Sequence, residues 1–578
     1  MKGAGTRRAF IGTVCGVAGG AMAGCLGASV EGNDSERTFR MIGSPIRTLD
    51  PVAANDGASY RVITQLFDGL LQYPKGNPEP ELLLADDVTV SDDERTYTFT
   101  LKDDVTFNDG STLSASDVVY SFERVAVSPH STHASLLFDH LGVEHERKGD
   151  EYVPGTLGVE AMDRKTVELR LESPFYATLD VLALPSLAIV PEGIVGDVPG
   201  YDGRMPRKEF ATETPVGAGA FTFDYWQSDA EYAVTARDDY HGDGPHVDGI
   251  HWHVMSNPTA GYTYATNENA DAFWVPNSKF DPAKVTIETI DEQGRKIGTY
   301  GPLPENGRTV RYVQVPLATT YYIGFNTQRV PKPVRKAVAH VMNQEQEVED
   351  VRKDRGESAV HLTPPSIFPG GVESAMEHAT SYPYGRDESK LDEARAVMER
   401  AGYGSDDRER FTITTYQSSS WSQTAKLLQD KLRAVYIDLE IEQASFPTLA
   451  ERGRNGTLEA FSYGWVMDYP SPETFLKLLA PRNTTDSFLF WEDTAAANRA
   501  KRAWNRVLDH RSSSEADAKA RHEAYIEMEE ANWEDVALIP TFYPVGEGFY
   551  YQWVNIPKTG AAGFAKHKYT DVTIDRRP

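Results

Sequence analysis

The chain has 578 residues, with 86 Asp and Glu against 58 Lys and Arg, and a formal net charge of −28. This length exceeds that of one usual hydrophobic core, so two or three domains are expected, and the composition is that of a globular protein. Such an acidic balance argues against a nucleic-acid partner, because phosphate binding needs a basic face.

An acidic surface stays hydrated and soluble when salt screens its charges. The composition therefore favours a halophilic protein, such as one from a haloarchaeon. An ordinary acidic exported protein is the alternative interpretation of the same charge.

The first residues of the chain resemble a targeting segment, which is not expected to be part of the folded protein. Thr6-Arg7-Arg8-Ala9-Phe10-Ile11 resembles a twin-arginine export signal, and the apolar run that follows it is too short to span a bilayer. The run ends in Met22-Ala23-Gly24-Cys25, which resembles a lipobox. We therefore predict a signal peptide over residues 1–24. A chance Arg-Arg pair before a plain signal anchor is the alternative.

Cleavage before Cys25 leaves an N-terminal cysteine that carries lipid, followed by a polar tether over residues 25–37. The mature protein is then expected outside the cytoplasm, anchored by lipid to the outer face of the cell membrane. Cys15 lies in the discarded part, so no thiol remains for a disulfide, a nucleophile or a zinc cluster.

Short strands and amphipathic helices follow in turn. The hydrophobic spacing predicts strands and helices in both halves of the chain, which is typical of an α/β fold. In the first half these are a strand at Thr38–Ile42, a helix at Ala58–Leu70, strands at Asp86–Val90, Thr96–Leu101 and Val105–Phe107, and a helix capped by Ser114-Ala115-Ser116-Asp117. In the second half, helices are predicted at Lys390–Tyr403 and Trp421–Val435, with a strand after the latter.

Long motifs in this order resemble the dipeptide/oligopeptide/nickel family of substrate-binding proteins for ABC importers, solute-binding protein family 5. The resemblance begins at Leu49-Asp50-Pro51 and continues through SDDERTYTFTLKDDVTFNDGSTLSASDVV from Ser91. It extends to TPVGAGAF from Thr214, and to Tyr322-Ile323-Gly324-Phe325-Asn326 with the VRKAV helix from Val334.

This resemblance implies an α/β, two-lobed periplasmic-binding-protein-like clamp of type II, with an extra subdomain on the first lobe. Lobe I is expected at residues 38–56, 214–316 and 536–578, and its subdomain at residues 57–213. Lobe II is expected at residues 319–535. Two crossings of the chain, near residues 317–326 and 535–543, would form the hinge.

The segment Phe461–Leu476 places one carboxylate, Asp468, among Tyr463, Trp465 and Tyr469 on a loop broken by prolines. Aromatic faces exclude water and strengthen charge interactions, so this pattern indicates a polar anchor in an apolar cleft. From the residues alone, the favoured interpretation is that Asp468 caps the helix that follows or ends a turn.

The resemblance assigns roles to these residues. Peptide binders of the family carry W-x-x-D-Y, in which the Asp pairs with the peptide's α-ammonium, and this matches Trp465-Val466-Met467-Asp468-Tyr469. Asp468, Trp465, Tyr463, Tyr469 and Asn326 are therefore the predicted ligand-binding residues, although a hinge role for Asn326 stays open. Ser462 stands where many relatives carry an Arg, which leaves the group that binds a ligand carboxylate unassigned.

Catalytic, metal-binding and cofactor-binding residues are not expected. The sequence has no G-x-S-x-G, Walker A or Cys-x-x-Cys motif, and its acidic pairs fall in turns. His251 and His253 alternate across a strand, so they face opposite sides.

We therefore expect a monomeric, non-enzymatic receptor that captures di- or oligopeptides and delivers them to an ABC permease with its ATPase subunits. A receptor for a nickel complex, an oligosaccharide or another polar solute is the first alternative. An exported hydrolase and a sensory or scaffold protein are the others.

Overall fold

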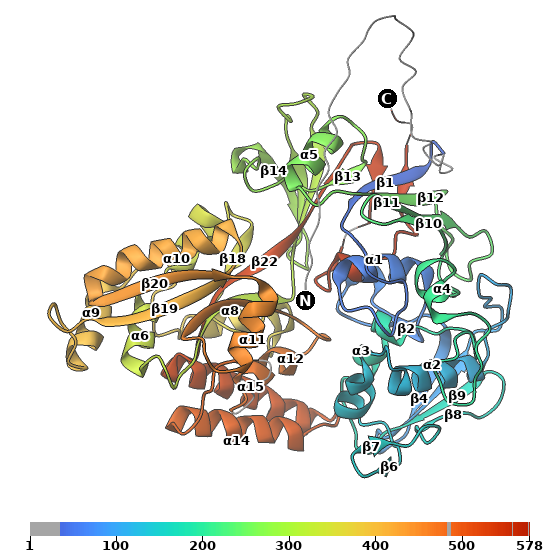
Figure 1. Cartoon of the computed structure of the whole chain (residues 1–578), viewed down its shortest axis with the longest axis horizontal. Helices are drawn as coiled ribbons and strands as arrows, with labels where there is room; N and C mark the ends of the chain where they lie inside the picture. The colour runs from blue at the N-terminus through green and yellow to red at the C-terminus, as the bar shows by residue number, and fades with distance from the viewer. Residues whose placement is uncertain (1–34, 482–486, 558, 576, 578) are drawn as a thin grey trace, which may run out of the picture. The chain divides into compact units, whose positions relative to one another are not determined.

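The computed structural model describes residues 35–575 apart from 482–486 and 558, and it also describes residue 577. The predicted signal peptide, Cys25 and most of the predicted tether therefore lie outside the described residues. From Glu36 onward the chain contacts form a single unit. Two large sheets in this unit share one long strand (Figure 1).

The sheet of lobe I is nine strands wide and mostly antiparallel. Only β1 runs parallel to its neighbours β12 and β13, and Thr38 of β1 lies opposite Gly249 of β12. The strand order is β10 (Phe221–Gln227), β11 (Glu231–Ala236), β12 (Gly249–Val254), β1 (Thr38–Gly43), β13 (Ala272–Phe273), β22 (Leu538–Tyr550), β16 (Val310–Pro316), β15 (Lys296–Tyr300) and β14 (Val285–Ile290). Helix α5 (Pro258–Thr266) joins β12 to β13.

The sheet of lobe II is mixed. Strand β19 runs parallel to both of its neighbours, β20 and β21, whereas β17 runs antiparallel to β21 and β22. The order from the shared strand is β22, β17 (Thr319–Phe325), β21 (Ala460–Val466), β19 (Glu409–Tyr416) and β20 (Ile437–Ala444), and β18 (Gly356–Ser358) pairs with β22.

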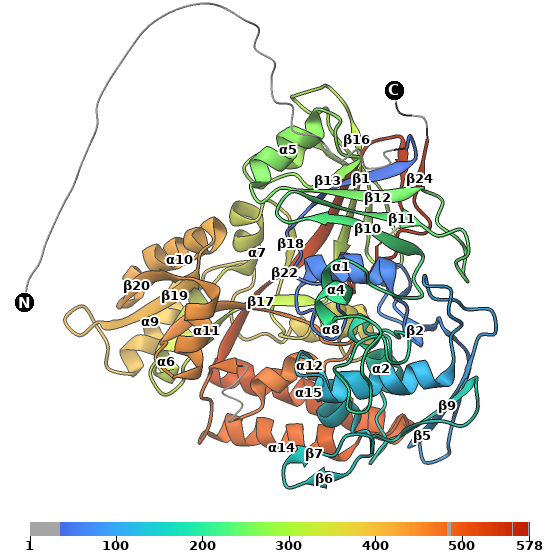
Figure 2. The same cartoon turned by 45° about the vertical axis from the view of Figure 1, so that its right-hand side comes forward.

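Two layers of helices bury the two faces of the lobe II sheet. One core contains side chains of α6 (Lys332–Val341), α9 (Leu391–Arg400) and α10 (Ser419–Leu432). The other contains side chains of α11 (Phe446–Arg454), α12 (Glu473–Leu476), α14 (Ala495–Asp509) and α15 (Glu515–Asp535). Figures 1 and 2 show α14 and α15 side by side.

The shared strand β22 is one of two connections between the lobes. Residues up to Pro544 pair with β17 and β18 of lobe II, and residues from Val545 pair with β16 of lobe I. The second connection is the link of two residues between Pro316 and Thr319. The chain enters the lobe I sheet later than the expected boundary at residue 536, because Leu538, Ile539 and Phe542 are buried in the lobe II cores.

The segment between β1 and β10 forms a smaller sheet of four antiparallel strands, in the order β4 (Ala85–Val90), β5 (Thr96–Leu101), β9 (Thr166–Arg170) and β8 (Val159–Ala161). Helix α2 (Ala115–Val127) lies against it and begins at the predicted cap, since Ser114 and Asp117 bond reciprocally. The short helices α3 (Thr178–Leu182) and α4 (Arg207–Thr212) complete this subdomain.

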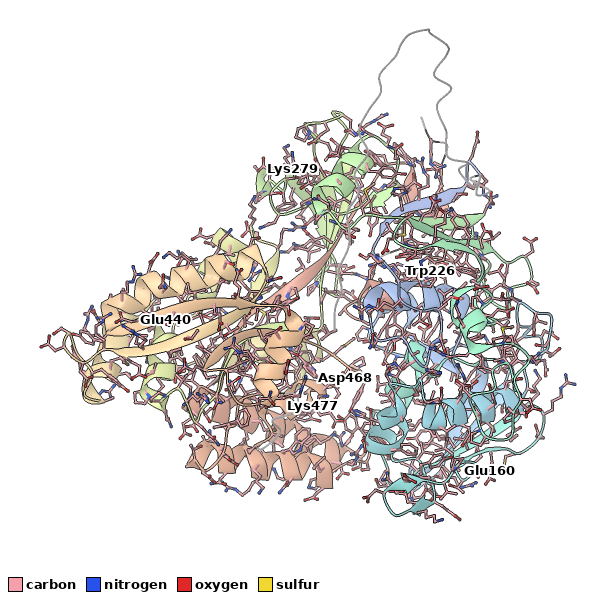
Figure 3. All side chains as sticks on the ribbon, in the orientation of Figure 1. Glu160, Trp226, Lys279, Glu440, Asp468 and Lys477 are labelled. Atoms are coloured by element: carbon pink, nitrogen blue, oxygen red, sulfur yellow. The ribbon has the colours of Figure 1, made fainter. Side chains whose placement is uncertain are left out.

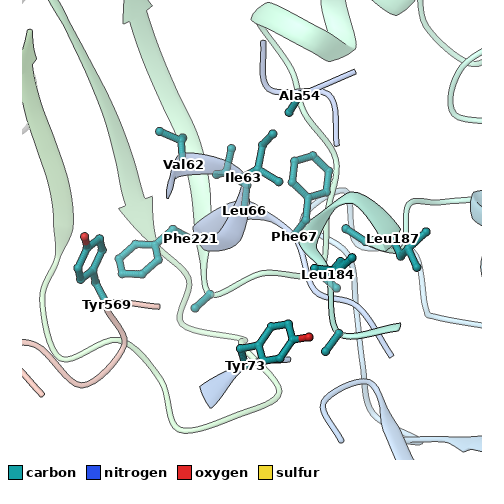
Figure 4. Packing of buried hydrophobic residues seen from close by; sticks show 14 of the residues in the cluster. Ala54, Val62, Ile63, Leu66, Phe67, Tyr73, Leu184, Leu187, Phe221 and Tyr569 are labelled. Atoms are coloured by element: carbon teal, nitrogen blue, oxygen red, sulfur yellow. The ribbon is translucent and has the colours of Figure 1, made fainter. Parts of the chain in front are cut away.

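Helix α1 (Gly57–Leu66) joins the subdomain to lobe I through one continuous core. Figure 4 shows Ile63 and Leu66 of α1 among Leu184, Phe221 and Tyr569, which come from both parts. The helix stops four residues before the predicted end, because the carbonyl of Leu66 accepts the amide of Gly219 and the chain turns away. A Cβ on Gly219 would lie 2.4 Å from the Leu66 carbonyl carbon, so this approach requires glycine.

A buried ion pair explains the Leu-Asp-Pro motif at the start of the chain. Asp50 accepts two 2.8 Å hydrogen bonds from the Arg124 guanidinium on α2, and neither side chain is exposed. Arg124 also pairs with Asp197 at 2.9 Å. The pair ties the first loop of lobe I to the subdomain, because a bidentate Arg–carboxylate contact fixes both groups in orientation.

Candidate functional site

The candidate site lies at the carboxyl ends of the parallel strands of lobe II. Strands β19, β20 and β21 end at Tyr416, Ala444 and Val466, and parallel pairing brings these ends to one edge of the sheet. Ligands in open α/β sheets bind outside this edge. Asp468 follows the end of β21 by two residues, so the sheet itself places its carboxylate there.

Asp468 is held on a loop, residues 467–472, that we call the Asp468 loop. The amide of Met467 donates to the carbonyl of Ala318, in the link between the lobes, at 3.1 Å. The Asp468 side chain is 34% exposed, and Oδ2 lies 2.9 Å from Nζ of Lys477. Figure 3 shows both residues on the side of lobe II that faces the subdomain. Asp468 thus stays partly open to solvent beside a cation of its own lobe.

The charge of Asp468 also acts on two groups outside lobe II. Burial lowers the pKa of Lys566, in the C-terminal segment, to about 8, and the negative charges of Asp468 and Asp180 oppose this shift. Burial likewise lowers the pKa of His140 in the subdomain, again opposed by Asp468. The carboxylate of Asp468 therefore interacts electrostatically with the C-terminal segment and the subdomain, as well as with Lys477 of its own lobe.

Apolar surface surrounds this carboxylate. Trp465 is half-buried, and the Lys477 ammonium lies 4.8 Å from the centre of its ring. Trp465 Nε1 has no hydrogen-bond partner among the described residues. Nearby at the same sheet edge, Val466 is 65% exposed and Phe446 is 55% exposed. An apolar surface next to one carboxylate suits a ligand that carries both a cation and apolar groups.

The other predicted ligand residues lie behind this surface. Tyr463 is buried between Phe446 and Phe488 in the lobe II core. Tyr469 is also buried, and its hydroxyl donates to Glu473 while its ring contacts His140 and Phe175 of the subdomain. Both tyrosines support the Asp468 loop rather than presenting a free face.

Asn326 is buried inside lobe II. Its side-chain amide donates to the carbonyl of Gly456 at 3.2 Å, and its side-chain oxygen accepts from the amide of Gln328. Because these bonds use its polar atoms to shape the turn after β17, Asn326 is not part of the site that we propose below.

A pocket of about 330 Å³ lies where the lobes meet, at the end of β19 and beside Phe542 of β22. Asn277 of lobe I lines it together with Arg352, Arg355, Tyr416, Ser418, Trp421 and other lobe II residues. The guanidinium of Arg352 lies 4.1 Å from the ring centre of Phe542 and pairs with the buried Glu347 at 2.7 Å. Its Nε and Nη2 both donate to the Glu347 carboxylate. The pocket therefore combines the Arg352 cation with aromatic walls.

The subdomain touches lobe II beside the Asp468 loop. The hydroxyls of Tyr176 and Ser471 lie 2.6 Å apart. Arg511, in the link between α14 and α15, donates to the carbonyl of His140 at 2.8 Å and lies over the ring of Phe175 at 4.3 Å. Movement of the lobes relative to one another would break these contacts, so the loop is coupled to lobe arrangement.

Comparison with known proteins decides the family. A family model described as bacterial extracellular solute-binding proteins, family 5 middle, matches residues 79–486. The chain belongs to family 5. The predicted resemblance is thereby confirmed, and the matched range includes the Asp468 loop.

Curated relatives of this family 5 protein align over most of its length. The dipeptide-binding protein DppE of Bacillus subtilis is 23% identical over 90% of this chain and 88% of DppE. The oligopeptide-binding protein OppA of Salmonella typhimurium is 23% identical over 93% and 92%. The glutathione-binding protein GsiB of Escherichia coli is 26% identical over 72% and 69%. The relatives are substrate-binding proteins.

Solved structures share the fold of this family 5 protein. The open, unliganded murein tripeptide binding protein MppA covers 94% of this chain and 98% of its own, with a TM-score of 0.68 and 21% identity. Haemophilus influenzae OppA in complex with the peptide RPPGFSPFR covers 94% and 99%, with a TM-score of 0.69 and 18% identity. The predicted α/β two-lobed clamp is therefore confirmed.

Two structural features are absent from the described part of this family 5 chain. Within residues 35–575 and 577, less the gaps, no three His, Cys, Asp or Glu side chains are grouped so as to hold a metal ion. Over the same residues, no helix is both long and apolar enough to cross a bilayer.

Sequence reasoning missed the cations at the site. Lys477, Lys566 and Arg352 are near Asp468 or in the pocket, but they are distant from each other in the chain. The only local signal was the basic run Arg352-Lys353-Asp354-Arg355 in an acidic chain.

Proposed function

We propose that this family 5 protein captures a peptide with a free α-ammonium group between its lobes and delivers it to an ABC permease. The observation that carries the proposal is the position of Asp468, a partly exposed carboxylate beside Trp465 at the carboxyl edge of the lobe II sheet. The relatives named for peptides and for glutathione support this class of ligand.

The ammonium group of the ligand binds Asp468 in place of Lys477, or shares the carboxylate with it. Lys477 holds Oδ2 at 2.9 Å, which leaves Oδ1 for a second donor. Trp465 and Val466 supply apolar surface for the adjacent part of the ligand. Closure of the lobes removes water from this pair, and a drier ion pair is stronger.

The carboxylate end of the ligand has its counter-charge in the pocket at the junction of the lobes. Ser462, where many relatives carry an Arg, is buried on β21 and provides no charge. The guanidinium of Arg352 lies over the rings of Trp421 and Phe542 and lines the pocket, and Arg355 adds a second cation. We propose Arg352 as the group that replaces the missing Arg.

Binding and release use the two connections between the lobes as a hinge. We place the hinge at the link between Pro316 and Thr319 and at Pro544–Val545, where β22 changes sheet. A ligand that contacts both lobes shifts the population toward the closed form. Export through the twin-arginine route and lipid attachment at Cys25 would hold the receptor at the outer face of the membrane. No catalytic step is required.

Calorimetry with four matched probes tests this function. The probes are Ala-Ala-Ala, its N-acetyl form, its C-terminal amide, and a maltooligosaccharide. Free tripeptide is expected to bind, and acetylation is expected to weaken binding about a hundredfold because it removes the ammonium partner of Asp468. Amidation is expected to weaken binding less.

Native mass spectrometry of protein purified without added ligand tests the same proposal independently. A bound mass that matches peptides supports it. Retention of an oligosaccharide or a nickel complex would assign another solute to the same receptor fold, and cleavage of the tripeptide would assign the protein to hydrolases.

A further inference from the structure

A second concave surface lies on lobe II, away from the Asp468 loop. We call it the outer groove. It has a volume of about 640 Å³ and is formed by α6, the end of α9, the loop at Pro383–Tyr384 and the end of α15. Figures 1 and 2 show α6 and α9 on the part of lobe II that is remote from lobe I. Its lining shares no residue with the pocket of Arg352.

The outer groove is basic in a chain whose net charge is −28. Lys332, Lys336 and Arg400 line it, with Glu534 as the acidic residue of the lining. Glu534 is 3.1 Å from Arg499 and 3.9 Å from Lys332. Lys332 is 2.5 Å from the buried Asp535, so this carboxylate balances the charge of Lys332.

The other two cations have no carboxylate within ion-pair distance among the described residues. Lys336 is half-buried, and it lies one helical turn after Lys332 on α6. Arg400 is exposed, and its Nε donates to the Ala396 carbonyl of its own helix. Burial lowers the pKa of Lys336, and the positive charges of Lys332 and Arg400 act in the same direction, while the negative charges of Glu534 and Asp535 oppose the shift. Like charges at this spacing destabilise a helix.

Apolar and aromatic groups complete the walls. Tyr384 and Trp533 are buried residues that line the groove, together with Pro333 and Val397. The ring of His340 packs against Tyr384 at 4.7 Å, and its Nδ1 is buried without a partner among the described residues. Pockets of this size with apolar walls and a few polar groups bind small molecules.

We propose that the outer groove binds a small organic anion, in which a carboxylate or phosphate group lies next to an aromatic or aliphatic body. The anion would lie between Lys336 and Arg400, and the body would lie against Trp533 and Tyr384. This site is separate from the peptide site and does not depend on it. Occupancy would place a counter-charge beside Lys336 and Arg400.

The test is calorimetry on the full mature chain, in potassium chloride at a concentration that keeps it folded. Phenyl phosphate and benzoate are the two anionic probes and separate the two head groups, while benzyl alcohol has the body without the charge. At least one anion is expected to bind, about tenfold or more tighter than the alcohol. Lys336→Gln combined with Arg400→Gln is expected to weaken binding about tenfold or more.

Two controls make the result specific. Lys426→Gln with Arg433→Gln removes two exposed cations of lobe II that neighbour Asp430, and it should leave anion affinity unchanged. Asp468→Ala should leave it unchanged too. The melting temperature of the groove double variant should not fall, because like charges have been removed. If it falls, Arg400→Gln alone is measured, since its side chain is exposed.

The proposal is overturned if neither anion binds below about 10 mM. It is also overturned if the groove variant keeps its affinity for the anion, if the Lys426→Gln, Arg433→Gln variant loses as much affinity as the groove variant, or if Asp468→Ala abolishes binding.

Discussion

Asp468 Oδ2 and Lys477 Nζ lie 2.9 Å apart within the same lobe, and the Lys477 ammonium also lies over the ring of Trp465. The proposed anchor for a ligand ammonium is thus already paired with a protein ammonium. A ligand must compete with Lys477 or share the carboxylate with it. The affinity for the ligand ammonium therefore depends on the difference in strength between the Asp468–ligand pair and the Asp468–Lys477 pair. Substitution of Asp468 and substitution of Lys477 each measure this difference.

Removal of the carboxylate tests the anchor directly. Asp468→Ala and Asp468→Asn are each expected to weaken binding of a free tripeptide by about tenfold to a hundredfold, because a desolvated ion pair is lost. Neither change should alter the affinity of the N-acetylated peptide, which has no ammonium group. Calorimetry on both peptides isolates the coupling. Equal losses for the two peptides would show that Asp468 acts on the shape of the loop.

Removal of the competing cation should have the opposite effect. Lys477→Met keeps an apolar stem against Trp465 and frees Asp468, so affinity for the free tripeptide is expected to rise about threefold to tenfold. Lys426→Met on the exposed face of α10 is the matched control and should have no effect. A fall in affinity for the Lys477 variant would mean that Lys477 holds Asp468 in its binding position.

Local patterns predicted the elements of the fold well. Tyr97, Phe99 and Leu101 alternate along Thr96–Leu101, and the structure buries all three on one face of β5. The predicted helix at Ala58–Leu70 stops at Leu66 because Gly219, more than 150 residues later, takes the carbonyl of Leu66. Helix propensity is a local property, so it could not predict that long-range contact.

The candidate site was only partly predictable. The motif around Asp468 is contiguous, so sequence could identify it. Lys566 comes from the C-terminal segment, and it comes within electrostatic range of Asp468 only through the return of β22 to lobe I. Tyr463 and Tyr469 were expected to face the ligand, but Tyr463 packs against Phe446 and Phe488 and Tyr469 packs against Phe175, so both are buried.

The buried pair of Asp50 and Arg124 is expected to dominate the stability of lobe I. Arg124→Met leaves Asp50 and Asp197 without their main partner in the interior, so the free energy of unfolding should fall by about 3–5 kcal/mol. Urea denaturation followed by fluorescence measures this. Arg37→Met, which breaks an exposed pair with Asp248, is the control and should cost less than about 0.5 kcal/mol. A small effect for Arg124→Met would mean that the interior relaxes to admit water.

His361 is expected to make stability fall in mild acid. Burial lowers the pKa of His361 to about 3, with a smaller contribution from His378, so the folded protein keeps the ring neutral. The unfolded chain takes up this proton below pH 6.5. The contribution of the neutral His361 to the free energy of unfolding is therefore fully present above that pH and is lost as pH falls toward 3. The loss is about 1.4 kcal/mol per pH unit.

Urea denaturation at pH 7.5 and pH 5.5 measures this dependence. His361→Phe keeps a ring against Trp533 and should reduce the difference in stability between the two pH values by about 1 kcal/mol. The exposed His130→Gln is the control and should leave the difference unchanged. An unchanged difference in the His361 variant would mean that other groups carry the acid sensitivity.

Arg511 is expected to stabilise the observed arrangement of the lobes. Its guanidinium bonds to the His140 carbonyl and packs on Phe175, both of which belong to the subdomain. Arg511→Ala removes these contacts, which should shift the equilibrium between lobe arrangements about fivefold to thirtyfold toward separation. Small-angle X-ray scattering without ligand should then give a larger radius of gyration.

The ligand response completes this test. A saturating ligand that contacts both lobes should return the Arg511 variant to the radius of gyration of the unmodified protein, at the cost of a weaker apparent affinity. Arg499→Ala, which removes an exposed pair with Glu534 within lobe II, should change neither quantity. An unchanged radius for Arg511→Ala would show that the lobes are held by the hinge and by the Tyr176–Ser471 contact instead.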